Sequence, residues 1–391
     1  MAHLSPDVML SIIACCSQRD VCNLMQTCRF FYEEGPRVLL RQTVHLETSI
    51  QLSGFLAFLR LQDGSRLAFV RSFRFELSDW NDNGAAEIFT YLPLMSNLRS
   101  LHFSHGEHLF QREPEVVDII AELTSLQELT VHHAGFETAR LLRSLQSELV
   151  CVDIDFNDLD DYPFFQTIRE EQYPRLHPVR ALSHSMATLT KLVCRQWYTH
   201  SKIVPDTRLV YPNLGELEIY DGGLPLVFPF IHAFPNLRHL AHRARPESRG
   251  HPLSAIEAFN LSEEYAAQRT LNVSQQISLG RTWERLCSFS GDLAGLYVLG
   301  LTCPIERVTL HLGCEDQPAM LGPSLSTARP RNLEVCGFEG YARTNGDLSK
   351  WREGLKAVFS GEGGSRLERF SGMSGIPLGG EIAQESDLSW P

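Results

Sequence analysis

One short pattern recurs along most of the chain and constrains its fold more than any other feature: apolar, two residues, apolar, one residue, apolar. Clear copies are LRSLHF, LQELTV and LGELEI, which begin at Leu98, Leu126 and Leu214. Successive side chains of a strand point to opposite faces, so the fourth and sixth residues of each copy share one buried face of a short strand. The other copies begin at Val70, Leu149, Leu189, Leu237, Ile305 and Leu333, and weaker ones begin at Trp283 and Leu367.

The spacing of these copies indicates a repeat protein. Most copies begin 22 to 28 residues apart, which is typical of leucine-rich repeats. Gaps of 40 and 46 residues, before Leu189 and before Trp283, indicate insertions or a copy that the pattern does not show. Helix-like segments lie between copies, and Val117, Ile120 and Leu123 share one helical face in such a segment. The alternative is a set of unrelated amphipathic strands in an ordinary α/β domain.

Length and charge narrow the class of protein further. With 391 residues, the chain has room for two or three globular domains or for one elongated repeat domain. It is 43% hydrophobic and 21% charged, which suits a folded core. Its net charge of −12 disfavours binding to nucleic acid or to an anionic membrane, because both favour a basic face.

No segment has the pattern of a signal peptide or of a membrane span, so we expect a cytoplasmic or nuclear protein. The 10 cysteines form no CxxC pair, and we expect reduced thiols. The glycosylation motifs at Asn260 and Asn272 are then chance matches.

The first forty residues differ in pattern from the repeats and predict three short helices. Ser5, Pro6 and Asp7 form a helix start, and Asp20 is expected to cap a second helix after a break. A Gly-Pro pair at 35–36 is expected to close a further turn. Three short helices cannot enclose a full hydrophobic core. We therefore expect these helices to leave apolar surface exposed for a partner.

These residues resemble the F-box, a helical module that starts with Leu-Pro and an acidic–aliphatic pair. Leu4, Asp7 and Val8 approximate that start, with Pro6 displaced by one position. The second half of the F-box pattern is Asp-aliphatic-x-x-Leu-x-x-Thr/Val-Cys-Arg/Lys-x-aromatic. The residues that match it are Asp20, Val21, Leu24, Thr27, Cys28, Arg29 and Phe31.

An F-box followed by repeats is the order of F-box/leucine-rich-repeat proteins, and the chain resembles the large fungal group of them. Its repeats resemble the irregular kind, because the fixed Asn of regular leucine-rich repeats is mostly missing. The resemblance implies an α/β fold, with a three-helix F-box in residues 1–45 and a connecting helical segment in 46–69. An irregular leucine-rich-repeat solenoid in 70–372 would carry strands on its concave face and helices outside, before a C-terminal tail in 373–391.

The resemblance also implies a function, that of a substrate receptor in an SCF-type ubiquitin ligase. The F-box would bind the Skp-family adaptor and the repeats would bind a protein target, with one copy of the chain in the complex. Candidates for adaptor binding are Leu4, Pro6, Val8, Ile12, Ile13, Val21, Leu24, Cys28 and Phe31. The competing interpretation is a non-ligase repeat scaffold whose F-box-like start only caps the first strand.

Candidates for target binding occupy the strand positions that flank the buried pair, since these point out from the sheet. They are His102, Glu128, His132, Asp153, Asp155, Lys191, Arg195, Glu216, Glu218, Tyr220, His239, Arg243, Arg307 and His311. Acidic residues dominate the early copies, and basic residues follow at Lys191, Arg195 and Arg243. We therefore expect bands of charge that suit a protein ligand of mixed charge.

No motif carries catalytic or cofactor chemistry, so we expect no enzyme, no cofactor and no metal. Asp153 and Asp155 fall at positions 1 and 3 of a calcium-loop pattern, but Asp158 stands where that loop needs Gly. His105 and His108 lack further zinc ligands at a useful spacing. No GxSxG motif and no phosphate-binding Gly-rich loop occurs.

Overall fold

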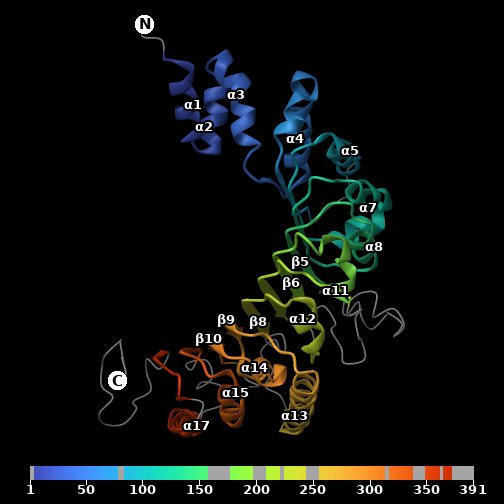
Figure 1. The fold of residues 1–391 in the computed structure, drawn as a ribbon. Helices are drawn as coiled ribbons and strands as arrows, with labels where there is room; N and C mark the ends of the chain where they lie inside the picture. Colours follow the sequence, from blue (N-terminus) through green and yellow to red (C-terminus); the bar gives the residue numbers. More distant parts are fainter. Residues whose placement is uncertain are drawn as a thin grey trace. The chain divides into compact units, whose positions relative to one another are not determined.

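The computed structural model describes residues 4–77, 83–156, 177–196, 208–220, 224–243, 255–312, 317–337, 348–361 and 364–371. Two compact units divide the chain, residues 1–164 and residues 165–391. Each unit has helices and parallel strands of its own (Figure 1).

Three helices open the first unit: α1 Pro6–Ala14, α2 Gln18–Met25 and α3 Arg29–Leu39. Serine hydroxyls cap the first two, because Ser5 Oγ accepts a hydrogen bond from the N–H of Val8 and Ser17 Oγ accepts one from that of Asp20. The second helix therefore begins earlier than the sequence predicts, with Ser17 instead of Asp20 as its cap.

The third helix continues through Gly35 and Pro36, so the predicted turn at these residues is wrong. A proline inside a helix removes one backbone hydrogen bond, but both residues are buried here. A side chain at position 35 would overlap the Met25 side chain of α2. The glycine thus lets α2 and α3 approach closely, and their packing keeps the helix intact.

The three helices share a small core. Ile13 of α1 and Val21 of α2 are fully buried, and Phe31 of α3 is nearly so. Partly buried side chains pack against this trio: Met9, Cys16, Leu24, Met25, Phe30, Val38 and Leu39. Each helix supplies one residue of this trio, so the core holds the three helices together.

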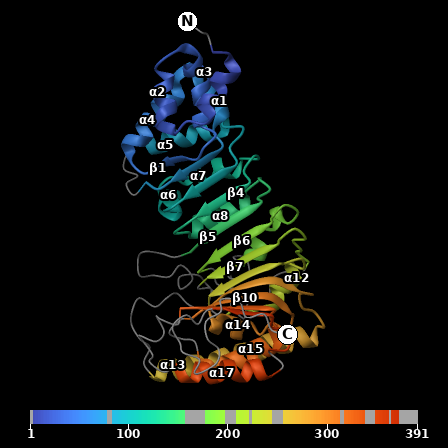
Figure 2. The ribbon, with the colours of Figure 1, turned by 90° about the vertical axis from the view of Figure 1, so that its left-hand side faces the viewer.

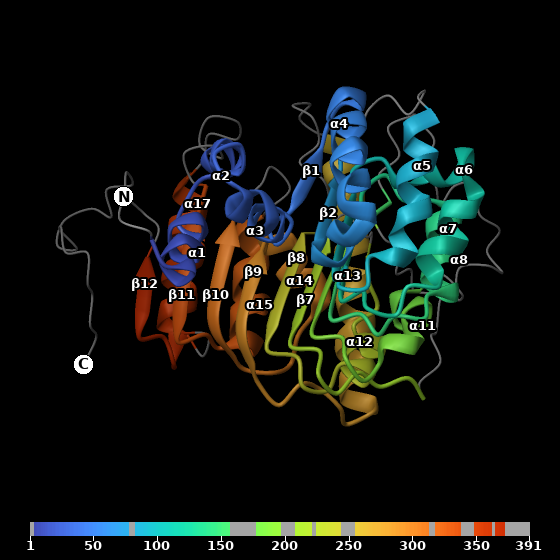
Figure 3. The ribbon, with the colours of Figure 1, turned by 90° about the horizontal axis from the view of Figure 1, so that it is seen from above.

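The rest of the first unit is a parallel sheet with helical connections. Its described strands are β1 Val44–Leu46, β2 Ser72–Phe75, β3 Ser100–Phe103, β4 Glu128–Val131 and β5 Cys151–Asp155, in chain order. The helices are α4 Ser49–Arg60, η1 Leu61–Phe69, α5 Asn83–Tyr91, η2 Leu92–Leu94, α6 Gly106–Arg112, α7 Pro114–Ala121 and α8 Phe136–Ser144. Figure 3 shows α5, α7 and α8 in succession along one side of this unit.

The second unit repeats this arrangement. Its strands are β6 Lys191–Arg195, β7 Glu216–Tyr220, β8 His239–Arg243, β9 Leu286–Gly291, β10 Ile305–His311, β11 Asn332–Cys336 and β12 Arg369–Ser371. Its helices are α11 Pro178–Ala181, η4 Ser183–Ser185, α12 Phe228–Ala233, α13 Ala255–Ser278, α14 Leu293–Leu299, η5 Pro318–Met320, α15 Leu321–Ala328 and α17 Leu348–Ser360. Figure 2 shows α14, α15 and α17 close together on one side of this sheet.

The repeat pattern places most strands correctly. In β3 and β7, the fourth and sixth residues of the pattern are Leu101, Phe103, Leu217 and Ile219, and all four are buried. Neighbouring strands pair in register, so equivalent residues of successive copies lie side by side. The parallel sheets are consistent with a solenoid.

The pattern assigns the wrong first residue to two copies and does not predict one strand. At β9 the first residue of the copy is Leu286 instead of Trp283. Trp283 lies in the turn before β9, and its Nε1 donates a hydrogen bond to the carbonyl of Phe234. At β11 Leu333 is the fourth residue of the copy and not the first. The missed strand is β1, which starts the sheet before the predicted connecting segment, whereas α4 and η1 do occupy that segment.

The 46-residue gap contains one long helix. Helix α13 spans 24 residues, and three polar side chains four residues apart join it to its neighbours. Gln268 and Asn272 donate to the carbonyl of Pro225, and Gln276 donates to that of Gly300. Asn272 is fully buried, so glycosylation of the folded chain at this motif is excluded, and the side chain of Asn260 lies outside the described residues. This gap is therefore an insertion in its described part.

A ladder of polar side chains precedes the strands. The Nδ2 atoms of Asn213 and Asn236 donate to the carbonyls of Ala187 and Pro212, at 2.6 and 2.8 Å. In the first unit, Asn97 bonds the carbonyl of Ala68 in the same way, at 2.7 Å. Each bond joins one repeat to the one before it. These asparagines directly precede the first residue of the copies at Leu98, Leu214 and Leu237.

His242 is a polar residue in the row of apolar side chains on the buried face of the second unit's strands. It is the sixth residue of its copy and is fully buried at a position that is apolar in most other copies. The equivalent residue of the next strand is Gly291, where a Cβ would overlap the carbonyl oxygen of His242. The glycine therefore lets β9 approach the backbone of β8 closely.

No helix of the described residues is long and apolar enough to cross a lipid bilayer. No disulfide joins the cysteines within the described ranges.

Candidate docking and target-binding surfaces

Helix α1 presents an apolar face to solvent. Leu4, just before the helix, is 55% exposed, and Val8 and Ile12 within it are 44% and 38% exposed; their spacing of four residues places Val8 and Ile12 on one side of the helix. Leu10, which the sequence analysis did not select, is also exposed on this helix. Burial of such apolar side chains by a partner is favourable, so this face is a candidate docking surface.

The structure divides the predicted adaptor-binding residues into two groups. Leu4, Pro6, Val8, Ile12 and Cys28 are exposed. Ile13, Val21 and Phe31 are buried between the helices, and Leu24 is half-buried against them. Direct contact of the buried trio with a partner is at odds with this placement, because their side chains are already used to hold the helices together.

A buried arginine joins α3 to the segment before the second strand. Arg66 of η1 is fully buried, and its Cζ lies 4.2 Å from the ring centroid of Phe58 and 5.3 Å from that of Tyr32. Its Nη1 donates a hydrogen bond to the carbonyl of Phe58. A second such contact joins Arg37 of α3 to Phe69 of η1, at 5.1 Å. These contacts fix α3 against the start of the repeats.

The outward face of the first sheet carries acids and histidines. Register places Arg74, His102, Thr130 and Asp153 in one row across β2 to β5. Glu128 is exposed at the start of β4, and Asp155 is half-buried at the end of β5. These residues lie opposite the buried face, as the alternation predicts. The later positions of the calcium-loop pattern, which the sequence argues against, lie outside the described residues.

Two histidine pairs lie at the ends of β3 and β4. The rings of His102 and His132 meet edge to face at 5.0 Å, and those of His105 and His133 stack at 5.0 Å. Burial lowers the pKa of His102 to about 4, and repulsion from His132 and Arg74 adds to this shift. Burial also lowers the pKa of His105. Both rings are therefore neutral at pH 7.

The structure brings together three metal-ligating side chains that the sequence analysis missed. His45 Nε2 lies 2.7 Å from a carboxylate oxygen of Glu76 and 3.6 Å from one of Glu47. This is the one such group among the described residues. The Arg74 guanidinium already donates to Glu76, and a cation at this place would have to compete with it. Glu76 is distant in the sequence, so spacing alone gave no signal.

Six outward side chains of β6, β7 and β8 form one connected cluster. We name it the Tyr220 cluster, and it consists of Lys191, Arg195, Glu216, Glu218, Tyr220 and Arg243. Lys191 Nζ lies 2.8 Å from Glu218 Oε1 and 3.4 Å from Glu216 Oε2. The hydroxyl of Tyr220 donates to Glu218 Oε2 at 2.7 Å. Six residues that the sequence analysis selected individually are thus one contiguous site.

Electrostatics keep the Tyr220 cluster charged. Burial by itself would raise the pKa of Glu218, but hydrogen bonds from Lys191 and Tyr220 outweigh it and lower that pKa below its usual value. The hydrogen bond to Glu218 is the main reason why the pKa of Lys191 is raised. Burial, and then Glu218, raises the pKa of Tyr220 to about 12, so its hydroxyl keeps its proton.

The remaining target-binding candidates extend the same outward face. Register aligns Glu216, His239 and Arg307 in one row through Ser288, whose hydroxyl lies 2.8 Å from His239 Nδ1. Arg307 is exposed and His311 is half-buried on β10. His239, Arg307 and His311 are therefore neighbours of the Tyr220 cluster on this face.

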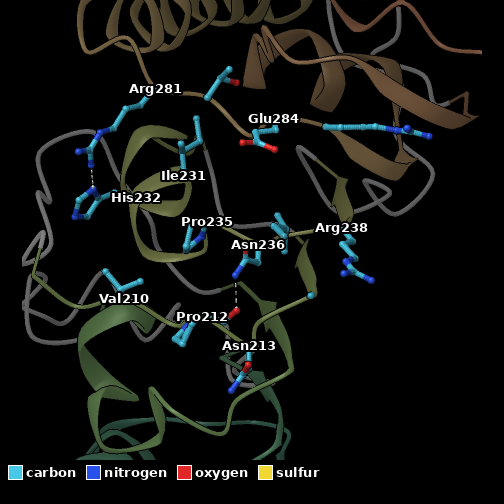
Figure 4. A pocket seen from close by; sticks show the side chains of 14 residues that line it. Val210, Pro212, Asn213, Ile231, His232, Pro235, Asn236, Arg238, Arg281 and Glu284 are labelled. Carbon is cyan, nitrogen blue, oxygen red and sulfur yellow. Dashed lines mark hydrogen bonds between the residues drawn. The ribbon is translucent and has the colours of Figure 1, made fainter.

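A groove lies beside the turns that lead into β7, β8 and β9. Its volume is about 1060 Å³, and three arginines line it: Arg238, Arg281 and Arg285. Arg281 donates to Nδ1 of His232, and Arg285 pairs with Glu306 outside the groove. Figure 4 shows Arg281 and His232 apart from Arg238, with Pro235 and Asn236 between them. The sequence analysis missed this groove because its residues come from turns of separate repeats.

Comparison with protein families matches residues 1–33 to the F-box domain. This match supports an F-box protein and covers α1, α2 and the first part of α3. No curated protein matches the chain.

Proposed function

We propose that this protein is the substrate-recognition subunit of an SCF-type ubiquitin ligase. The observation that carries the proposal is the F-box match over helices whose core is already filled by Ile13, Val21 and Phe31. The exposed face of Leu4, Val8 and Ile12 is then left to bind the Skp-family adaptor. Ordinary F-box domains bind that adaptor, which gives the exposed face a partner of known class.

The repeats would act as the target-binding part. The twelve parallel strands of the described residues and the 22- to 28-residue spacing support a leucine-rich-repeat solenoid, although no family match covers this region. The leucine-rich-repeat class and the fungal resemblance therefore stay predictions. The protein would work by proximity, holding a target near ligase machinery on the adaptor side, and would itself perform no bond chemistry.

Co-purification with a Skp-family adaptor tests the proposal. We expect the full chain to capture the adaptor and the double variant Val8→Asp, Ile12→Asp to lose at least about tenfold, because two charges would be buried at the interface. The matched control is Ile277→Asp on α13, which changes an exposed side chain of the other unit and should leave capture unchanged.

Two results would contradict the adaptor role. One is a folded full chain that captures no adaptor, which favours the repeat scaffold with an F-box-like cap. The other is a double variant that captures as much adaptor as Ile277→Asp. The same double variant can be used to identify targets in cells. A chain that does not bind the adaptor should still bind its targets, and these targets should not be ubiquitylated.

A further inference from the structure

We infer that His45, Glu47 and Glu76 bind a zinc ion at the ends of the first two strands. The sequence analysis expects no metal, because these ligands come from two segments that are distant in the sequence. None of the three is a candidate for adaptor or target binding. The inference therefore goes beyond the proposed function and does not depend on it.

Strand pairing brings the three ligands together. His45 of β1 pairs with Arg74 of β2, and the same register, continued past Leu46, places Glu47 beside Glu76. Residues two apart in a strand share one face, so His45 and Glu47 lie on the side of the sheet that Glu76 also faces. Figure 3 shows β1 beside β2. The site thus joins two neighbouring strands.

Hydrogen bonds hold the backbones of the ligands in place. The N–H of Glu76 donates to the carbonyl of Leu46 at 2.9 Å, and the N–H of Glu47 donates to Gln51 Oε1 at 2.7 Å. Gln51 belongs to the capping box at the start of α4. A metal ion that binds here has to order only side chains, and that lowers the entropic cost of binding.

The ligand atoms lie at distances close to those of a coordination site. His45 Nε2 is 2.7 Å from Glu76 Oε2 and 3.6 Å from Glu47 Oε1, and the three ligand atoms lie within 4.8 Å of one another. A tetrahedral zinc ion with bonds of about 2.1 Å places its ligand atoms about 3.4 Å apart. Small rotations of these partly exposed side chains would therefore admit the ion. Three protein ligands leave a further position open for water or for a side chain of a partner.

Arg74 competes with the ion but leaves it a ligand atom. Its guanidinium donates to Glu76 Oε1, whereas His45 lies against Oε2 of the same carboxylate. The arginine thus fixes the orientation of the carboxylate, as hydrogen-bond partners of metal ligands commonly do. The two carboxylates outnumber the one guanidinium, so the cluster still attracts a divalent cation.

The imidazole selects the kind of metal. Ca²⁺ takes roughly six to eight oxygen ligands, and Mg²⁺ also prefers oxygen in a strict octahedral arrangement. One nitrogen with two carboxylates is instead a donor set that suits zinc. A zinc ion bound here would stabilise the pairing of β1, the first strand of the sheet, with β2.

Hydrogen exchange of the full chain tests the inference on protein that has been stripped with EDTA and dialysed. Because the ligands meet only when β1 and β2 are paired, ZnCl₂ at about 100 times its Kd should slow exchange of the β1 and β2 amides by up to about 100-fold. MgCl₂ and CaCl₂ at the same concentration should have little effect. The local readout separates this site from zinc bound by exposed cysteines elsewhere in the chain.

Variants assign the effect to the ligands. His45→Gln, Glu47→Gln and Glu76→Gln each remove one ligand, and each should raise the zinc concentration needed for protection at least about tenfold. The matched control His108→Gln changes an exposed histidine of α6 in the same unit and should respond like wild type. His102→Gln removes one ring of the nearby histidine pair and should also respond like wild type. Without zinc, His45→Gln and Glu47→Gln should keep the urea midpoint of wild type, because both side chains are exposed.

Exchange in β1 and β2 that is the same with and without ZnCl₂ would overturn the inference. Ligand variants that respond to zinc like His108→Gln, or a response that is lost in His102→Gln, would also overturn it. Equal protection by CaCl₂ would overturn the assignment to zinc. Adaptor capture measured on the same preparations keeps the two proposals apart. A chain that shows the zinc response but captures no adaptor loses only the ligase role, and the reverse result removes only the zinc site.

Discussion

The two units bury the same pattern of side chains and differ in what their strands present on the outward face. The first unit displays acids such as Glu128 and Asp153, and the second displays bases such as Lys191 and Arg243 beside acids such as Glu218. The buried fourth and sixth positions are apolar in most strands of both units. Packing therefore fixes the inward residues, while the outward residues are free to differ, and it is the outward residues that report on binding.

Histidines sharpen the contrast. In the first unit they gather on the outward face, and burial, together with His132, lowers the pKa of His102 to about 4. In the second unit His177 and His242 are fully buried, and burial lowers the pKa of each to about 3. Acid should therefore affect the outward surface of the first unit and the fold itself in the second.

The largest expected effect comes from the buried positions, where the units should behave alike. Phe103→Ala in the first unit and Ile219→Ala in the second should each lower the free energy of local opening by about 2 to 5 kcal/mol, because each leaves a cavity. Hydrogen exchange of the strand amides measures this unit by unit. If only one of the two variants loses protection of its strand amides from hydrogen exchange, the two units do not depend on their buried positions in the same way.

The next effect is the acid sensitivity of the second unit. The unfolded histidine binds a proton below its usual pKa of about 6.5, whereas folded His242 stays neutral down to its pKa of about 3. Stability is therefore complete above pH 6.5 and falls by up to about 1.4 kcal/mol per pH unit as the pH decreases toward 3. Urea midpoints at pH 7 and pH 5 measure this loss.

The variant His242→Leu should reduce the pH dependence, because it places an apolar side chain where most other copies have one. His311→Leu, at a half-buried outward position, is the control and should keep the dependence of the wild type. A pH dependence that is the same in His242→Leu and in wild type would remove His242 as its source.

The smallest effect is expected from single outward charges. Glu128→Gln and Arg307→Gln change exposed side chains of the two units and should leave the urea midpoint unchanged. If either one destabilises its unit as much as Phe103→Ala does, the outward face is part of the fold and the division between the two faces fails.

Alternation predicted most of the strands, because a period of two is a local property of the sequence. It failed where a buried residue belonged to a turn, as at Trp283, and where a strand had a weak pattern, as at β1. Helix ends depended on single side chains. The hydroxyl of Ser17 caps α2, so this helix begins earlier than predicted. Packing of Gly35 against Met25 allows α3 to continue through Gly35 and Pro36.

The outward orientation of single residues was predictable, but their grouping was not. The outward positions were correct, yet nothing in the sequence shows that Tyr220 lies between two guanidiniums, because that depends on the register of three strands. The three-arginine groove and the burial of Arg66 gave no local signal either. Contacts between residues distant in sequence become visible only once the strands are paired.

The most direct measurement is titration of the purified full chain with a purified Skp-family adaptor. The account predicts a one-to-one complex that is lost in the Val8→Asp, Ile12→Asp variant and kept in Ile277→Asp. A folded chain with no measurable affinity for the adaptor, or a complex that survives the double change, would contradict the proposed role.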